Sequence, residues 1–263
     1  MTAFAPAPSG GNRSLALAFR FALRELRGGL RGFYIFIACI ALGVAAIAGV
    51  ASVSRALTEG ISNEGQAILG GDMSFRLVHR EADAAEYAYV QSLGEVTRTA
   101  TLRAMARKTD GSDQALVELK SVDGAYPLYG TLSLAGGTHP AEAMGRQPDG
   151  SFGAVADASL LARLGLEPGD KLSIGRATVT LTGVIATEPD KLSGGLEFGP
   201  RLMLSEAALP ETALVQPGSL VTWSYMVKLP PGTTDEGIIR LIEQSREQFP
   251  QAGWRIQSRA SAS

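Results

Sequence analysis

The side chains that most often carry enzyme chemistry are few in this sequence, and they do not have the spacing of known catalytic or metal motifs. The 263 residues include two histidines, His79 and His139, and one cysteine, Cys39. The cysteine lies in an apolar run and the histidines lie in separate segments, so a zinc site is not expected. The sequence also lacks the G-x-S-x-G pattern of a serine nucleophile elbow.

Phosphate-loop and carboxylate chemistry are not indicated either. The nearest approach to a G-x-x-x-x-G-K-[ST] phosphate loop is LEPGDKLS, in which the glycine spacing is absent and Asp170 precedes Lys171. Glu188 and Asp190 form a carboxylate pair, but Pro189 between them is typical of a turn. We therefore expect a protein that is not an enzyme, with no catalytic residue, cofactor or metal on this chain.

The strongest pattern in the sequence is an apolar run, LRGFYIFIACIALGVAAIAGVASVSR, at residues 30–55. The 23 residues between Arg31 and Arg55 carry no charge. As a helix they would be about 35 Å long, which exceeds the hydrocarbon thickness of about 30 Å. A helix in a soluble core seldom avoids charge over this length, so residues 32–54 are predicted to form one transmembrane helix.

The charge of the chain changes at the same point. Residues 1–31 contain five arginines and one glutamate, whereas the net charge of the whole chain is −2, so residues 32–263 are acidic overall. Basic residues favour the cytoplasmic side of a span. The N-terminus is therefore predicted to be cytoplasmic and the large domain extracytoplasmic (periplasmic), at the inner (plasma) membrane. The acidic balance argues against a nucleic-acid partner.

The basic segment predicts an amphipathic helix. Apolar residues recur every three or four positions from Leu15 to Leu30, and four arginines follow a neighbouring face: Arg20, Arg24, Arg27 and Arg31. Such a helix can lie on an anionic bilayer, although solvated faces of globular helices show the same pattern. Residues 1–31 are interpreted as a cytoplasmic tail and interfacial helix, with the lipid bilayer as a partner.

Two further features of the run bear on its role. Ala41, Ala45 and Gly49 form a stripe of small residues, which would let another helix approach closely in lipid, although alanine is common throughout the chain. A cleaved signal peptide is the alternative interpretation, with Ala46-Ile47-Ala48 as the cleavage site. The run is longer than the apolar region of about 7–15 residues in signal peptides, which favours an uncleaved anchor.

The rest of the chain has the pattern of an α+β domain. Residues 55–71 are predicted to form a helix that projects from the membrane and stops at Gly70-Gly71. Residues 72–263 alternate between strands and short helices without an internal repeat. The stretch at 136–150, rich in glycine and proline, is the predicted boundary between two lobes.

Helix caps and loops add local predictions. Asp157 is expected to cap a helix over 158–164, and Thr233 with Glu236 to form the capping box of a later helix. The later helix is expected to point four apolar residues inward: Ile238, Ile239, Ile242 and Phe249. The loop at 188–200 and AYPLYG could make functional contacts, or their aromatic side chains could pack across lobe edges: Tyr126, Tyr129 and Phe198.

This order of elements, together with four sequence blocks, resembles the first part of a MacB/FtsX-type ABC transporter permease, and in particular the YbbP-like permeases. The blocks are VDGAYPLYG at 122–130, LLARLGLEPGDKLSIG at 160–175, EPD at 188–190 with PRLML at 200–204, and VQPGSLVTWSY at 215–225. None is a catalytic motif. The resemblance implies that residues 72–263 are a MacB-like periplasmic core domain.

The resemblance also implies a function and partners. In that family a separate cytoplasmic ABC ATPase subunit, which binds ATP and Mg²⁺, drives a pair of permease copies whose extracytoplasmic domains lie between the first and second spans. The chain is then expected to be the N-terminal part of a permease subunit acting on a lipid, lipoprotein or hydrophobic compound. Because the family continues into further spans, we expect an N-terminal fragment or truncated product.

Two other functions remain open. The chain could be a single-span, membrane-anchored extracytoplasmic scaffold or binding protein that has no ATPase. It could also be an enzyme released by cleavage after the run, although the missing nucleophile and metal motifs disfavour this. Retention of an ATPase during purification would argue against the free-standing scaffold. The mass of the mature chain would show whether cleavage releases a soluble enzyme.

Overall fold

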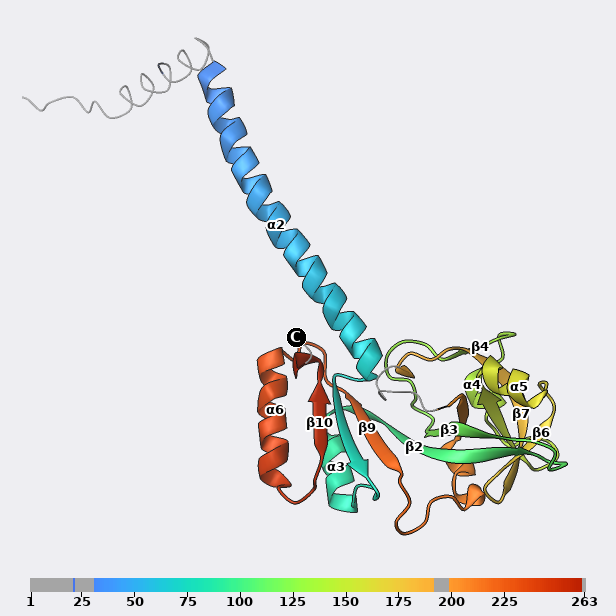
Figure 1. Ribbon diagram of the computed structural model, residues 1–263. Helices are drawn as coiled ribbons and strands as arrows, with labels where there is room; N and C mark the ends of the chain where they lie inside the picture. The colour runs from blue at the N-terminus through green and yellow to red at the C-terminus, as the bar shows by residue number, and fades with distance from the viewer. Residues whose placement is uncertain (1–20, 22–30, 192–198, 262–263) are drawn as a thin grey trace, which may run out of the picture. The chain divides into compact units, whose positions relative to one another are not determined.

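The computed structural model describes residues 21, 31–191 and 199–261. The chain divides into two compact units, residues 1–60 and 61–263. The long helix α2 (Arg31–Leu69) begins in the first unit and ends in the second (Figure 1). Of the four arginines predicted to face a membrane surface, Arg31 begins α2, and the other three lie outside the described residues: Arg20, Arg24 and Arg27.

The membrane span predicted at 32–54 falls within α2. In the parts of the chain that are described, no helix combines the length and apolarity needed to cross a membrane. The predicted span therefore stays a prediction.

The end of α2 agrees with the predicted stop. The helix ends at Leu69, and Gly70 follows with φ 75°, a backbone conformation that glycine adopts without strain. At Gly71 an added Cβ would lie 2.9 Å from the carbonyl oxygen of Met73. The two glycines therefore let the chain turn directly from the helix into strand β1.

Residues 61–263 are built around a mixed sheet. Its ten strands, counted over the described residues, have the order β10-β1-β9-β2-β3-β8-β5-β7-β4, and β6 joins β2 and β7. Only the pairs β3–β8 and β5–β7 are parallel in this part of the chain. The strands are β1 (Met73–Val78), β2 (Glu95–Lys108), β3 (Gln114–Val122), β4 (Ser133–Leu134), β5 (Phe152–Ala156), β6 (Lys171–Ile174), β7 (Ala177–Thr187), β8 (Arg201–Ser205), β9 (Thr222–Lys228) and β10 (Arg255–Ser258).

The sheet does not divide at 136–150, where the sequence predicted a lobe boundary. That stretch contains the short helix α4 (Pro140–Ala143) and glycine turns, after which β5 pairs with β8 beside β3. Strands β9 and β10 then return to pair with β1. The glycines and prolines of this stretch therefore form turns within one connected sheet, and both ends of residues 72–261 meet where β1 pairs with β10.

Helices cover one face of the sheet. Figure 1 shows α3 (Ala84–Leu93) and α6 (Asp235–Gln248) beside the strands β1, β9 and β10. The ring of Tyr89 in α3 lies 5.2 Å from that of Phe249, which ends α6. Phe75 of β1 lies 5.1 Å from Trp254 in an edge-on arrangement. These aromatic contacts close the apolar core over the sheet.

The two faces of the sheet differ because side chains alternate along each strand. In β2, Ala100, Leu102 and Ala104 belong to the apolar core. Thr99 and Thr101 alternate with them in sequence and therefore point to the opposite face. The strands thus place an apolar core on one side and a row of polar side chains on the other.

Two of the predicted helix caps differ from the structure. Asp157 precedes α5 (Ala158–Leu164), but its side chain does not cap that helix and instead accepts from the Arg201 backbone N–H at 3.0 Å. The N-cap of α6 is Thr234, one residue later than predicted, because the Thr233 hydroxyl donates to the carbonyl of Pro230.

Of the four residues predicted to point inward from α6, Ile238 is buried but Ile239 is 47 % exposed. Ile239 follows Ile238 by one position, which turns its side chain about 100° away around the helix. The prediction was therefore wrong for Ile239.

A charged cap fixes α3 to the end of β1. Asp83 and Glu86 form a capping box, and the buried Glu86 carboxylate also accepts two hydrogen bonds of 2.7 Å from Arg80. The hydrogen bonds from Arg80 hold the Glu86 pKa below its usual value, against the effect of burial. A depressed pKa means that ionised Glu86 stabilises the folded state.

We expect Glu86→Gln to lower the free energy of unfolding at pH 7 by about 1–3 kcal/mol, because a charge-assisted pair is lost. This stabilisation is present above the ordinary carboxyl pKa of 4.5 and disappears as pH falls through the lower folded-state pKa. The gap between the two proteins should therefore narrow in acid. Urea unfolding of the full chain, followed by fluorescence of Trp223 and Trp254, measures it.

Glu243→Gln on the exposed side of α6 is the matched control, since it makes the same chemical change at an exposed position. It should leave the free energy of unfolding within about 0.5 kcal/mol of the original chain. A Glu86→Gln effect no larger than this, or one that does not change with pH, contradicts the assignment.

Candidate functional site

One buried carboxylate joins the two ends of the sheet domain. Asp72, only 3 % exposed, accepts hydrogen bonds from the side chains of Gln66 (2.7 Å) and Tyr129 (2.8 Å) and from the Leu229 backbone (2.9 Å). Arg259 Nε lies 3.1 Å from the same carboxylate, and the Arg259 backbone N–H donates to the Asp72 carbonyl. The last turn of α2 and the residue after β10 are thus held at one point.

A second carboxylate cluster surrounds a buried lysine. Lys120 of β3 is 4 % exposed, and its Nζ lies 2.9 Å from Glu188 Oε1 and 2.8 Å from Asp190 Oδ1. The ammonium group also donates to the Tyr126 hydroxyl at 2.9 Å, and that hydroxyl donates to Asp190. A buried ammonium ion is costly unless it is paired and fully hydrogen-bonded, and these contacts meet that requirement.

Arg201 of β8 extends the cluster. Its Nε lies 3.1 Å from Glu188 Oε2, and its Nη1 lies 3.2 Å from Glu118 Oε1. Burial acts to lower the pKa of the guanidinium, but the charges of Glu188 and Glu118 outweigh it and raise that pKa. The pKa of the Tyr126 phenol is raised as well, by burial and by the adjacent Asp190 and Glu188 carboxylates. Arg201 therefore stays protonated and Tyr126 stays neutral at neutral pH.

The sequence interpretation of Glu188 and Asp190 as turn residues missed this role. Both carboxylates are buried and bind cations, and Pro189 holds them one residue apart on the same side of Lys120. Pro189 also packs on Gly130, where an added Cβ would lie 2.5 Å from the proline Cβ. The EPD and AYPLYG segments, which the sequence left open as contacts or packing, therefore meet over the same lysine.

The end of α2 lies beside both carboxylate clusters, because Gln66 contacts Asp72 and Gly70 lies against Asp190. At Gly70 an added Cβ would lie 3.3 Å from the Asp190 Cβ and 3.6 Å from its Oδ2. Tyr129, which donates to Asp72, lies three residues after Tyr126, which donates to Asp190. A displacement of the α2 end would therefore press directly on both clusters.

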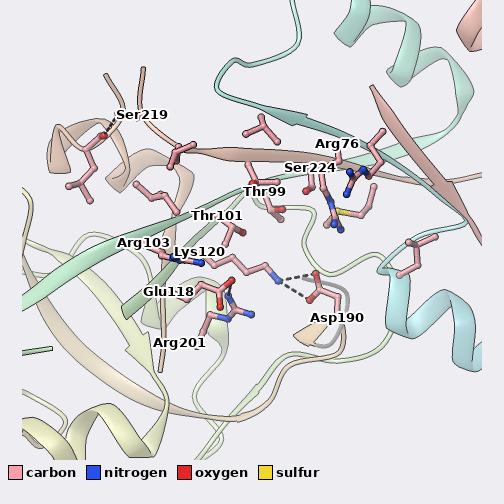
Figure 2. A pocket seen from close by; sticks show the side chains of 18 residues that line it. Arg76, Thr99, Thr101, Arg103, Glu118, Lys120, Asp190, Arg201, Ser219 and Ser224 are labelled. Atoms are coloured by element: carbon pink, nitrogen blue, oxygen red, sulfur yellow. Dashed lines mark hydrogen bonds and ion pairs between the residues drawn. The ribbon is translucent and has the colours of Figure 1, made fainter. Parts of the chain in front are cut away.

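A groove of about 650 Å³ opens over the polar face of the sheet. Figure 2 shows Arg76 and Ser224 near one end, Arg103, Glu118 and Arg201 near the other, and Lys120 pointing toward Asp190. Its basic side chains within the described residues are Arg76, Arg103, Lys120, Arg201 and Arg255. Two carboxylates, Glu118 and Asp190, line it as well, so the lining is cationic overall.

The sequence-predicted site residues lie elsewhere. The stripe of Ala41, Ala45 and Gly49 belongs to α2 in the first unit, and an added Cβ at Gly49 would meet no atom within 4 Å. Its role in helix packing stays a prediction. Within residues 31–191 and 199–261, no three side chains of histidine, cysteine or acidic residues gather in an arrangement that could hold a metal ion.

We expect Lys120→Met to lower the free energy of unfolding by about 3–5 kcal/mol, because it leaves Glu188 and Asp190 buried without their shared cation. Adding Asp190→Asn should recover part of that loss, since one uncompensated charge is removed. Urea unfolding of the two single variants and the double variant, read from tryptophan fluorescence, gives the coupling energy between Lys120 and Asp190.

Lys171→Met is the matched control, because Lys171 pairs with Asp149 at 2.6 Å while both side chains are more than 40 % exposed. An exposed pair contributes about 0–1 kcal/mol. Equal losses for the two lysine variants would show that the Lys120 cluster is not a stabilising one.

Comparison with known proteins identifies the family to which this chain belongs. Residues 34–245 match the MacB-like periplasmic core domain. A curated relative, the "Uncharacterized ABC transporter permease YbbP" of Escherichia coli (strain K12), is 32% identical over 187 residues. That match covers 71% of this chain but only 22% of the relative, so the chain spans less than a quarter of that protein's length.

Among solved structures, the chain matches the periplasmic region of MacB from Actinobacillus actinomycetemcomitans, at a TM-score of 0.49 and 11% identity over 75% of this chain and 93% of that one. The extracellular domain of the noncanonic ABC-type transporter YknZ from Gram-positive bacteria gives a TM-score of 0.46 and 10% identity, over 70% of this chain and 99% of that one. Because the family match covers most of its length, this chain belongs to the MacB-like periplasmic core domain family.

Proposed function

We propose that this chain is the N-terminal part of the permease subunit of an ABC transporter, and that residues 61–263 are its extracytoplasmic domain. The family match and the permease name of the curated relative support this assignment. The geometric observation that carries the proposed coupling is the buried Asp72, which joins the last turn of α2 to Arg259 at the other end of the domain.

In this proposal residues 32–54 form an uncleaved membrane span with the N-terminus in the cytoplasm. The charge-free run and the arginines before it support that orientation. The basic tail would lie against the bilayer surface. The small residues Ala41, Ala45 and Gly49 would allow a helix of a second permease copy or of another span to pack closely.

The domain would act as the moving part of the transporter and not as an enzyme. A cytoplasmic ABC ATPase subunit, which would bind ATP and Mg²⁺, would shift the span, and α2 would carry that movement to Asp72 and Asp190. Because the Asp72 carboxylate contacts four residues from separate segments, movement of the helix end would be shared among those segments. The substrate would be a lipid, lipoprotein or hydrophobic compound.

The orientation predicts a labelling pattern. Cys39 is the only cysteine, so Cys39→Ser gives a background for single cysteines. Asp110→Cys, in the exposed β2–β3 turn, should react with an impermeant maleimide in intact spheroplasts, whereas Asn12→Cys should react only after permeabilisation. Labelling of Asn12→Cys alone in intact spheroplasts would reverse the proposed topology, and a mature chain about 48 residues shorter would show that the run is cleaved.

Partnership with an ATPase predicts co-purification. The chain, extracted from membranes in a mild detergent, should retain an ATPase with a phosphate-loop motif. Arg259→Met should keep that partner but lower its ATP hydrolysis several-fold if the Asp72 contact carries the coupling, whereas Arg163→Met on the exposed side of α5 should change neither. Absence of any ATPase would favour a single-span scaffold, and normal hydrolysis with Arg259→Met would remove Asp72 from the coupling route.

A further inference from the structure

The groove over the polar face contains two arginines placed directly opposite each other. Arg76 of β1 and Arg255 of β10 are register partners in an antiparallel pair. Like charges in this arrangement repel and destabilise a sheet. Burial first, and then the charge of Arg255, lower the pKa of Arg76, while Asp190 acts in the opposite direction. An anion bound close to Arg76 and Arg255 would be attracted by both and would offset their mutual repulsion.

Hydroxyl groups continue from the arginine pair across the sheet. Ser224 is opposite both Arg76 and Thr99, and Thr222 is opposite both Val78 and Thr101. The side chains of these serine and threonine residues make no hydrogen bond to another described residue. Four hydroxyl groups thus form two adjacent cross-strand pairs that can donate to a ligand above the sheet.

The far side of the hydroxyl pairs is basic again. Thr101 is the register partner of Lys120, and Arg103 lies two residues further along the same face of β2. Glu118 and Asp190 line the groove and Glu188 lies behind it, so five basic side chains exceed the carboxylates by two within the described part of the site. The four hydroxyls therefore lie between basic groups on both sides.

The rim of the groove is apolar. Leu220 is 74% exposed and Val78 is 50% exposed, and both line the groove together with Leu214 and Met226. An inorganic anion would leave these side chains in water. A ligand with a hydrocarbon chain beside its anionic group would cover them, which releases water from apolar surface.

We propose that the groove binds the phosphate group of an anionic amphiphile, with the phosphate over Ser224, Thr99 and Thr101 and the hydrocarbon chain against Leu220 and Val78. Arginine forks match the oxygens of a phosphate, and together with the hydroxyls they supply more donors than the roughly four acceptor sites of a carboxylate would use. This assignment rests on the proposed function and names its substrate class.

The test is calorimetric titration of the purified full chain in maltoside micelles, which contain no phosphate. Short-chain phosphatidylglycerol should bind at least about tenfold more tightly than inorganic phosphate or short-chain phosphatidylcholine, because only the first pairs a net negative charge with a chain. Binding should weaken as salt rises. If inorganic phosphate binds as tightly as phosphatidylglycerol, the ligand is a free anion and the amphiphile proposal is wrong. If phosphatidylcholine binds as tightly, the net negative charge has no role in binding and the proposal is also wrong.

Variants distinguish binding in the groove from a general effect of positive charge on the protein. Arg255→Gln should weaken phosphatidylglycerol binding about tenfold through loss of a charge-assisted contact, and Thr101→Val should weaken it several-fold. Arg163→Gln on α5, which makes the same change outside the groove, should leave binding unchanged. Without ligand, Arg255→Gln should melt at the same or a higher temperature than the original chain, because it removes the opposed like charge.

An equal effect of the two arginine variants would overturn the site, as would a clear loss of melting temperature with Arg255→Gln in the absence of ligand. These measurements need no ATPase, so they fail or succeed independently of the co-purification that tests the transporter assignment.

Discussion

The buried ammonium group of Lys120 constrains much of the sheet domain around it. Since an isolated charge in the protein interior would cost several kcal/mol, the chain must bring carboxylates to it from elsewhere in the sequence. Glu188 and Asp190 lie directly after β7, and Tyr126 lies in the segment after β3. Arg201 then shares Glu188, which ties β8 to the same cluster. Four segments are fixed by the requirement that one cation be neutralised.

The local elements could be predicted because they follow from short-range patterns. The end of α2 before Gly70 and the helix α5 over 158–164 both depend on residues close in sequence. The role of Asp157 could not be predicted this way. An aspartate before a helix satisfies the pattern of an N-cap, but its carboxylate is used by the backbone of Arg201, 44 positions away, and by Lys191.

The candidate site was missed for the same reason. Lys120 alternates with apolar residues in β3, and that pattern is equally consistent with a solvated face of the strand. Two carboxylates around Pro189 are equally consistent with a surface turn. Only the pairing of β3 with β8 and the packing of Pro189 on Gly130 bring these groups together, and neither follows from spacing. The signal in the sequence was a lysine within a strand together with an EPD segment later in the chain. The number of residues between two such features is not fixed, so spacing could not link them.

The groove, the lysine cluster and the helix end share Asp190. This carboxylate lines the groove, accepts from Lys120 and packs against Gly70 at the end of α2. An anion bound in the groove would draw on the same basic groups that Asp190 contacts, so ligand binding would change the forces on Asp190 and, through Gly70, on the helix end. By reciprocity of linked equilibria, movement of α2 would then change the affinity of the groove for its ligand. The proposed transport function needs this reciprocal relation, because a domain driven through one helix must release what it has bound.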